Sequence, residues 1–276
     1  MTGAACPTLG IGVLSWHGYD SLAASLASHR AGKLFDHADE ALVFLPEISD
    51  RGRDIARRFD LPFAGSAQNL GILGGFKALA ESFSTDLLIL IENDYQLVEP
   101  APTVSAQLTT ARADIAAGAV AFVMLRHRLK PGEPWSIDKV RRLHPPVEAP
   151  PFARLTAAIG RALRPDKASR LLGRAAYLWE RPEKVRPDVF SRSQSGTIIV
   201  SSRHLPWSNC PTLVPRRFYL EQVIAEAEAR TAGRLINGFP SIETELNTRW
   251  WRERNIPIGI AVEGLFSQIR QEYRGY

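Results

Sequence analysis

The fold is decided by the stretch Asn69-Leu-Gly71-Ile-Leu-Gly74-Gly75-Phe-Lys77, which leads to the apolar run Asp86-Leu-Leu-Ile-Leu-Ile91 and then to Glu92-Asn93-Asp94. The glycines predict a turn that opens a helix over residues 75–83. The apolar run is too short for a buried helix and is typical of a buried parallel strand. Because ligands bind at the carboxyl ends of strands in open α/β sheets, we expect a ligand site at Glu92 and Asp94.

Strands and helices are predicted to alternate along the chain. We expect further strands over residues 9–14, 40–45, 61–64, 119–125, 195–200 and 256–262, and further helices over residues 20–29, 52–59, 102–117, 219–231 and 240–255. Such alternation indicates an α/β fold with a mostly parallel central sheet, flanked by helices and joined by right-handed crossovers.

The composition indicates a folded protein in a reducing compartment. Of 276 residues, 45% are hydrophobic and 23% are charged, which is enough to bury a core. Cys6 and Cys210 give neither zinc-ligand spacing nor a disulfide framework. No apolar run reaches the roughly 18 residues that cross a bilayer, and the first one lacks a signal peptide's charged leader. We therefore expect a cytoplasmic protein.

A basic segment interrupts the α/β pattern. Residues 126–192 hold 16 Lys and Arg against 7 Asp and Glu, with many prolines. Two helices are expected within 152–179, split at Arg164-Pro165, and apolar residues recur at helical spacing at Phe152, Leu155, Ile159 and Leu163. The segment reads as an insertion or lid. It could be a solvated face, cover a diphosphate, mediate self-association or contact an anionic membrane. Nucleic acid is disfavoured as a partner, because no known nucleic-acid-binding motif accompanies the positive charge.

The two carboxylates of Glu92-X-Asp94 could both reach one hard cation, Mn²⁺ or Mg²⁺, with phosphate oxygens completing its shell. The alternative is a solvated corner between a strand and a turn. The glycine-rich stretch before the strand would let backbone approach an anion. It matches neither the dinucleotide-binding fingerprint nor a P-loop, and a plain turn is its alternative.

This order of parts resembles the GT-A glycosyltransferases, in particular the family 2 type. The resemblance rests on Asn69-X-Gly71-X-X-Gly74-Gly75-Phe76, a helix, and a buried strand that ends in an acidic triplet. It covers residues 10–97 and returns in 240–270. It implies a divalent cation at Glu92 and Asp94, the counterparts of the family's DXD motif. It also implies that the nucleotide sugar binds at Trp16, Glu47, Asn69, Gly71, Gly74, Gly75 and Asn93.

The second matched region implies the catalytic base. Glu243 falls where the family places its catalytic Asp, and Glu245 is the second candidate. Attack on the face opposite the leaving group would invert the anomeric centre. Trp250 and Trp251 are expected to line the acceptor site, because aromatic faces suit sugar rings. Ser195 and Gly196 are expected at its floor.

Two departures from the family concern the metal. Glu92 stands where the family has an Asp, and Gln268 stands where many members have a metal-binding His. An amide oxygen is a weak ligand, so an Arg or Lys could take over part of the cation's role.

The resulting prediction is one GT-A-like domain. Residues 1–125 would bind the nucleotide sugar, 126–192 would form the insertion, and 193–276 would bind the acceptor. The enzyme would move a sugar from a nucleoside-diphosphate sugar to a glycan or lipid-linked acceptor in cell-surface polysaccharide synthesis, at the inner face of the membrane. Two alternatives stay open. A nucleotidyltransferase would need a basic glycine-rich loop after the first strand, which Leu14-Ser-Trp-His-Gly-Tyr19 lacks. A non-catalytic binding protein is the other.

Overall fold

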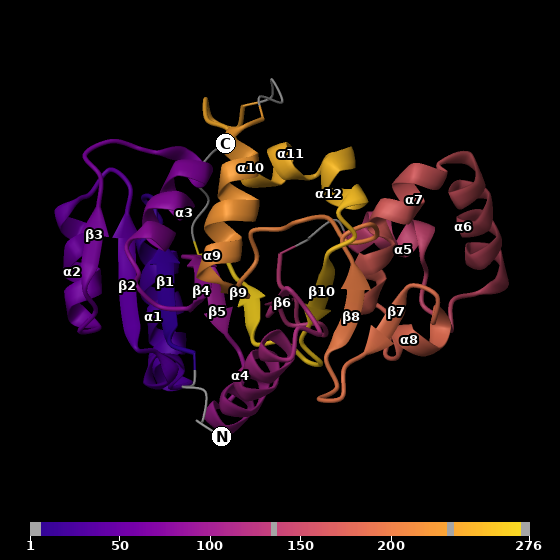
Figure 1. Cartoon of the computed structure of the whole chain (residues 1–276), viewed down its shortest axis with the longest axis horizontal. Coiled ribbons are helices and arrows are strands. Elements are labelled where there is room, and N and C mark those ends of the chain that lie inside the picture. Colours follow the sequence, from indigo (N-terminus) through magenta and orange to yellow (C-terminus); the bar gives the residue numbers. More distant parts are fainter. Residues whose placement is uncertain (1–6, 134–136, 231–234, 272–276) are drawn as a thin grey trace.

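A nine-stranded mixed sheet forms the centre of the molecule (Figure 1). The computed structural model describes residues 7–133, 137–230 and 235–271. Within these ranges the strand order is β3-β2-β1-β4-β9-β6-β10-β8-β7, and β11 pairs with β5 in a second, two-stranded sheet. Helices pack on both faces, which confirms the predicted α/β fold.

The amino-terminal half is the parallel part of the sheet. Four strands run parallel here: β1 (Leu9–Leu14), β2 (Glu40–Leu45), β3 (Phe63–Gly65) and β4 (Leu87–Glu92). In their register, Leu14 of β1 stands opposite Phe44 of β2 on one side and Glu92 of β4 on the other. Helices α1 (Tyr19–Ala31), α2 (Asp50–Arg58) and α3 (Gly71–Glu81) and the 3₁₀ helix η1 (Leu34–His37) connect them. Every residue of β1 is buried. Apolar strands covered on both faces explain why these runs were predictable.

Helix α3 begins four residues earlier than predicted, at Gly71 instead of Gly75. The first glycine of the motif therefore forms the turn, and the later glycines lie inside the helix. A Cβ on Gly75 would stand only 3.0 Å from the Leu14 side chain, so this glycine lets the helix approach the sheet closely.

The middle of the sheet changes direction. Strand β9 (Thr212–Pro215) lies antiparallel between β4 and β6 (Phe122–Met124), and β10 (Pro257–Ile260) then runs parallel to β6. Strands β8 (Ile198–Ser201) and β7 (Phe190–Arg192) complete the edge as an antiparallel pair. Helix α4 (Ala101–Ala116) precedes β6. A continuous helical stretch follows β9 as α9 (Arg216–Phe218), the π-helical η3 (Tyr219–Ile224) and α10 (Ala225–Glu228).

The two-stranded sheet brings the end of the chain to the end of β4. Strand β5 (Tyr95–Leu97) follows the acidic triplet directly and pairs antiparallel with β11 (Phe266–Gln268). In this register Gln268 stands opposite Tyr95, next to Asp94.

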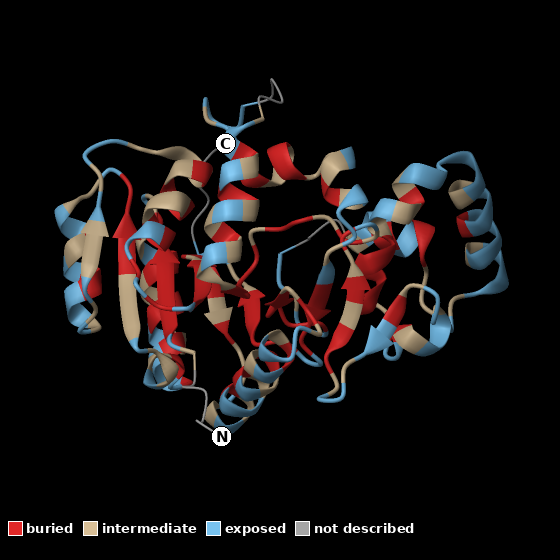
Figure 2. Cartoon of the chain, viewed as in Figure 1, coloured by how far each residue is buried: buried red, intermediate tan, exposed pale blue. Residues whose placement is uncertain are grey.

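The basic segment forms a helical layer at one end of the molecule (Figure 1). It contains α5 (Ile137–Leu143), α6 (Pro151–Leu163), α7 (Pro165–Leu172), the 3₁₀ helix η2 (Gly173–Tyr177) and α8 (Pro182–Val185). The predicted break at Pro165 is confirmed. Helix α6 buries only Ala157, and its apolar residues at positions 152, 155, 159 and 163 are 52–76% exposed (Figure 2).

The helix predicted over residues 240–255 is two short helices, α11 (Ile242–Leu246) and α12 (Arg249–Glu253), with Asn247 and Thr248 between them. Asn247 leaves the helical path because its side chain holds both the N–H and the carbonyl of Trp207. Among the described residues, no helix has both the length and the apolar character needed to cross a bilayer.

Candidate active site

A cavity of about 440 Å³ lies at the carboxyl ends of β1 and β4. It is where the strand-end rule places a ligand. Segments far apart in the sequence supply its described lining residues, which are Leu14, Trp16, Pro46, Asn69, Gly71, Ile72, Glu92, Asn93, Asp94, Asn209, Ile236, Asn237, Phe239, Ser241, Glu243 and Arg270. The cavity thus unites the acidic triplet with the distant Glu243.

Trp16 and Glu47 meet at the wall formed by the loops after β1 and β2. The Trp16 indole N–H donates to Glu47 Oε2 at 3.0 Å, and His17 Nε2 lies 3.1 Å from the same oxygen. These contacts, that of Trp16 first, lower the pKa of the exposed Glu47 carboxyl. Trp16 lines the cavity, whereas Glu47 is not among the lining residues and holds the indole ring of Trp16 through this hydrogen bond. The pairing of these two predicted residues brings an aromatic face and an anion together.

Gly71 shapes the turn that enters the cavity. Its φ is +65°, and its N–H donates to the side-chain oxygen of Asn69 at 2.9 Å. A Cβ at this position would stand 2.4 Å from Cβ of Phe239. Asn69 and Gly71 line the cavity as predicted, whereas Gly74 and Gly75 are inside α3 and do not. The family resemblance implied a nucleotide-sugar role for all four residues, and the start of α3 at Gly71 places Gly74 and Gly75 within the helix, outside the cavity lining.

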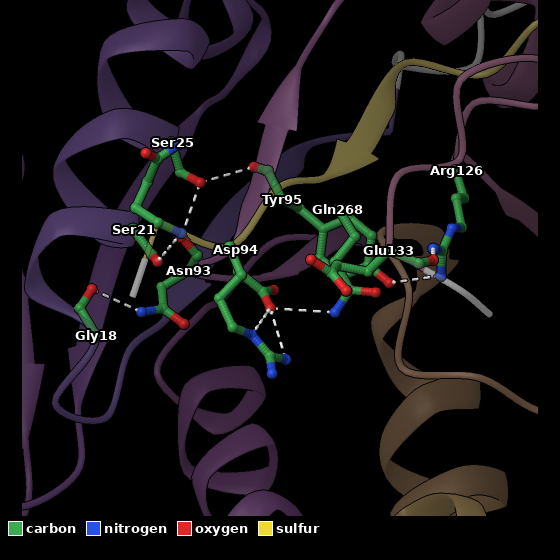
Figure 3. A network of polar contacts seen from close by, with 11 residues as sticks. Gly18, Ser21, Ser25, Asn93, Asp94, Tyr95, Arg126, Glu133 and Gln268 are labelled. Carbon is green, nitrogen blue, oxygen red and sulfur yellow. Dashed lines mark hydrogen bonds and ion pairs between the residues drawn. The ribbon is translucent and has the colours of Figure 1, made fainter. Parts of the chain in front are cut away.

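The acidic triplet spans the end of β4. Glu92 is the last residue of the strand and pairs with Leu14, and Asn93 and Asp94 are buried. The Asn93 side-chain amide donates to the carbonyl of Gly18 at 2.8 Å, which ties the triplet to the start of α1 (Figure 3). The triplet is therefore part of the buried framework as well as of the cavity wall.

Asp94 is bound on one oxygen only. Gln268 Nε2 donates to its Oδ2 at 3.1 Å (Figure 3). Arg270 Nη2 donates to the same oxygen at 3.2 Å. Oδ1 is buried and has no hydrogen-bond partner among the described residues. Burial is the largest single effect and lowers the pKa of Arg270, but the charge of Asp94, its hydrogen bond and the charges of Glu133 and Glu92 together outweigh burial, and the pKa is raised. The cavity therefore holds a fixed positive charge beside the triplet.

The residues fit a divalent cation in one particular way. The described residues contain no group of three His, Cys, Asp or Glu side chains placed to hold a metal by themselves. Glu92 and Asp94 both face the cavity, and the unpartnered Oδ1 of Asp94 is a hard oxygen donor. A cation bound by one or two carboxylates commonly completes its shell with substrate phosphates. The fit is to a cation shared with a bound diphosphate.

Glu243 lines the same cavity. It is in α11, and its Oε1 accepts a hydrogen bond from the backbone N–H of Asn209 at 2.9 Å. Glu245 is only 2% exposed and does not line the cavity. Side chains two residues apart on a helix point in different directions, so of the two predicted bases Glu243 lines the cavity and Glu245 does not.

The four residues predicted for the acceptor site lie outside this cavity, and Trp251 lines a second cavity between α7 and α12. Trp251 is 1% exposed and donates to the Leu205 carbonyl at 3.0 Å, and Trp250 packs between the guanidinium groups of Arg230 and Arg254. None of the four is among the first cavity's described lining residues. Adjacent positions on a helix cannot share a face, and here one tryptophan was drawn into the core.

Ser195 and Gly196 form the turn between β7 and β8, where the Ser195 hydroxyl donates to Asp114 at the end of α4. This turn lies at the lower edge of the molecule in Figure 1, whereas α11 lies along the upper edge. Ile198 of β8 stands opposite Ile260 at the carboxyl end of β10, so the turn begins at the same edge of the sheet as the cavity. Three strands separate β8 from β4, and the twist across them carries the turn away from the acidic triplet.

Sequence reasoning missed Asn209, Phe239 and Arg270 as lining residues. Arg270 closes the matched carboxy-terminal stretch, and an arginine in place of the metal was foreseen in general terms. The pairing of β5 with β11 is needed to show that Arg270 is the arginine that contacts Asp94. Asn209 and Phe239 lie in irregular loops, and no pattern in the sequence marks them.

Comparison with known proteins supports the fold. No protein-family model and no curated sequence matches the chain. Among solved structures, the chain is similar to TarS of S. aureus, at 10% identity and a TM-score of 0.50, over 95% of this chain and 36% of that one. It is also similar to glucosyl-3-phosphoglycerate synthase from Mycobacterium tuberculosis, at 13% identity and a TM-score of 0.42, over 78% of this chain and 58% of that one.

A mannosyltransferase from Pyrobaculum calidifontis matches at 13% identity and a TM-score of 0.38, over 50% of this chain and 39% of that one. The chain spans only about a third to three fifths of the length of these proteins. The sheet topology and the match to TarS agree, and the chain has the GT-A glycosyltransferase fold.

Proposed function

We propose that this protein is a glycosyltransferase that moves a sugar from a nucleoside-diphosphate sugar to an acceptor hydroxyl, with inversion. One observation carries the proposal. The Asp94–Arg270 pair and the Glu243 carboxylate line a single cavity. Transfer needs both a site for a leaving diphosphate and a base for the incoming hydroxyl, and these two groups can supply them.

The donor nucleotide would lie along the amino-terminal wall. The Trp16 indole offers a face for stacking a base, and Glu47 is held beside it as a hydrogen-bond acceptor for base or ribose. The turn at Asn69 and Gly71 lets backbone come close to the diphosphate. The family 2 type and the identity of the nucleotide stay predictions.

The leaving diphosphate gains negative charge as the bond to the sugar breaks. Arg270, fixed by Asp94, can donate to its oxygens without reorganising. Glu92 and Asp94 would hold Mn²⁺ or Mg²⁺, and a bound cation would neutralise the same developing charge. The site thus has two sources of positive charge, and one of them is permanent.

Glu243 would act as the general base. The acceptor hydroxyl forms a bond to the anomeric carbon while its proton passes to the Glu243 carboxylate, and the diphosphate leaves with the electron pair of the broken C–O bond. The hydrogen bond from Asn209 N–H holds the carboxylate in place. Attack from the side opposite the diphosphate inverts the anomeric centre.

Glu243→Gln tests this assignment. The glutamine carbonyl can still accept from Asn209, so the fold and donor binding should persist while transfer falls about 10²-fold or more. Turnover is measured as nucleoside diphosphate released from a panel of nucleotide sugars. Glu253→Gln, an exposed change on α12, is the matched control and should turn over normally. Wild-type turnover in Glu243→Gln would place the base elsewhere, and no release by wild type from any donor would overturn the function.

The acceptor is proposed to be a glycan or its lipid carrier, used in cell-surface polysaccharide synthesis at the inner face of the membrane. The supporting feature is α6, whose apolar stripe faces outward: Leu155 and Leu163 are 59% and 76% exposed, while Ala157 faces the protein. The helix carries Arg154 and Arg161 and no acidic residue. An exposed apolar stripe on a basic helix suits the interface of an anionic bilayer.

Flotation with vesicles tests the membrane contact. Wild type should float with vesicles that contain phosphatidylglycerol and less with neutral phosphatidylcholine. Leu155→Asn should lower binding about tenfold, because burying one leucine is worth about 1.5–3 kcal/mol. Leu235→Asn, equally exposed but outside the insertion, is the control and should bind as wild type. Equal flotation of Leu155→Asn and wild type would remove α6 from the contact.

A further inference from the structure

A second cavity, of about 230 Å³, lies where the helical insertion meets α12. Its described lining residues include five cationic side chains and no acidic one. The five come from α5, α7, the segment after β8, and α12, and they are Lys139, Lys167, Arg170, Arg203 and Arg252. We call this the basic cavity.

The five cations lack the pairing found elsewhere on this protein. Several ion pairs among the described residues join an arginine to a carboxylate two to four residues away, such as Arg249 with Glu253. Within the described part of the chain, no ion pair involves any of the five, and Nε of Arg252 is buried without a hydrogen-bond partner. Like charges that converge on a concave surface repel one another and raise the local positive potential. An arrangement of this kind is suited to a bound anion.

The basic cavity is next to the candidate active site. Asn247 and Thr248 line it, and they directly follow α11, the short helix that carries Glu243. Asn247 is fixed by accepting from Trp207 N–H at 2.7 Å and donating to its carbonyl at 2.9 Å. Two residues after Trp207, the chain reaches the active-site cavity at Asn209. A single molecule could therefore present a hydroxyl to Glu243 and an anionic group to the basic cavity.

We propose that the basic cavity binds a phosphate group of the acceptor. This inference rests on the proposed function, because it takes the acceptor to be a phosphorylated or polyanionic compound whose hydroxyl reaches Glu243. Phosphate is the best match to several convergent guanidinium and ammonium donors, since its oxygens accept from more than one cation at once. The phosphate could belong to a soluble phosphorylated glycan or to a lipid carrier.

Two probes separate these sources. Isothermal titration of the full chain with glucose 1-phosphate tests a soluble sugar phosphate. Titration with dodecyl phosphate in neutral detergent, against detergent alone, tests a lipid phosphate. The variant Arg170→Gln/Arg203→Gln removes two exposed cations of the basic cavity and should weaken binding of the preferred probe about tenfold or more. The control Arg58→Gln/Arg217→Gln removes two exposed cations from other helices and should bind as wild type.

Nucleoside-diphosphate binding is measured on the same variants to keep the two proposals distinct. It should be unchanged in Arg170→Gln/Arg203→Gln, because neither residue lines the active-site cavity. Loss of phosphate binding there, with nucleotide binding intact, supports the proposal. Absent binding of both probes to wild type overturns it. So does probe binding that survives in this variant but disappears in Arg270→Gln, because the phosphate would then occupy the donor site. Absent nucleotide binding to wild type refutes the proposed function instead.

Discussion

Replacing Arg270 by Gln is the perturbation that separates the arginine's charge from that of a metal. Arg270 Nη2 lies 3.2 Å from Asp94 Oδ2, and the Asp94 side chain is 7% exposed against 37% for Arg270. The arginine is therefore anchored at its buried partner and still reaches the cavity. A hydrogen bond between charged groups is worth about 1.5–3 kcal/mol, which corresponds to about tenfold to a hundredfold in Kd.

The assay is calorimetric titration of the protein with whichever nucleoside diphosphate it binds, in the presence of a chelator. Arg270→Gln should weaken binding about tenfold to a hundredfold, and Arg270→Lys, which keeps the charge, should lose less. Adding Mn²⁺ should improve binding by a larger factor in Arg270→Gln than in wild type, because the change removes a positive charge beside Asp94 and leaves Gln268 as the remaining donor to Oδ2. Metal-free affinity equal to that of wild type, in a variant with a normal melting temperature, would refute the role of Arg270.

Three other changes probe the framework. Gly71→Ala should destabilise the protein by about 1–2 kcal/mol more than Gly118→Ala in urea unfolding. Both glycines have a positive φ, but only at Gly71 does a Cβ meet Phe239. Titration of His29 should lower the free energy of unfolding by about 3 kcal/mol as the pH drops from 6.5 to 4, and His29→Gln should reduce this loss in urea unfolding. Burial lowers the pKa of His29 from 6.5 to about 4 against the opposing effect of its hydrogen bond, so the unfolded chain takes up the proton first. Trp16→Leu should weaken nucleotide binding about tenfold, measured by calorimetry, because a stacking face is lost.

Predictions from the sequence succeeded where burial alone decides the structure. Strands β1 and β2 are predicted to the residue, and β4 is displaced by one, because continuous apolar runs must be covered on both faces. The break between α6 and α7 follows equally directly from Pro165, which removes an amide donor. These elements place the acidic triplet at the carboxyl edge of the sheet, and the general location of the site was therefore predictable.

Features that depend on long-range pairing were not predictable. Strands β5, β9 and β11 are three or four residues long, and their apolar patterns are too short to identify. The pairing of β5 with β11 decides that Gln268 and Arg270 meet Asp94. The position of β8 in the sheet, with three strands between it and β4, decides that Ser195 lies away from the cavity. The division of the chain into a donor half, an insertion and an acceptor half stays a prediction.

The central claim is that the cavity between Asp94 and Glu243 binds a nucleoside diphosphate. Its most direct test is isothermal titration of the full chain with UDP, GDP and dTDP, each with and without Mn²⁺. We predict saturable binding of at least one of them, with a Kd in the micromolar range, tightened by Mn²⁺ and weakened by Asp94→Ala. Failure of all three to bind, or equal binding to wild type and Asp94→Ala, would contradict the claim.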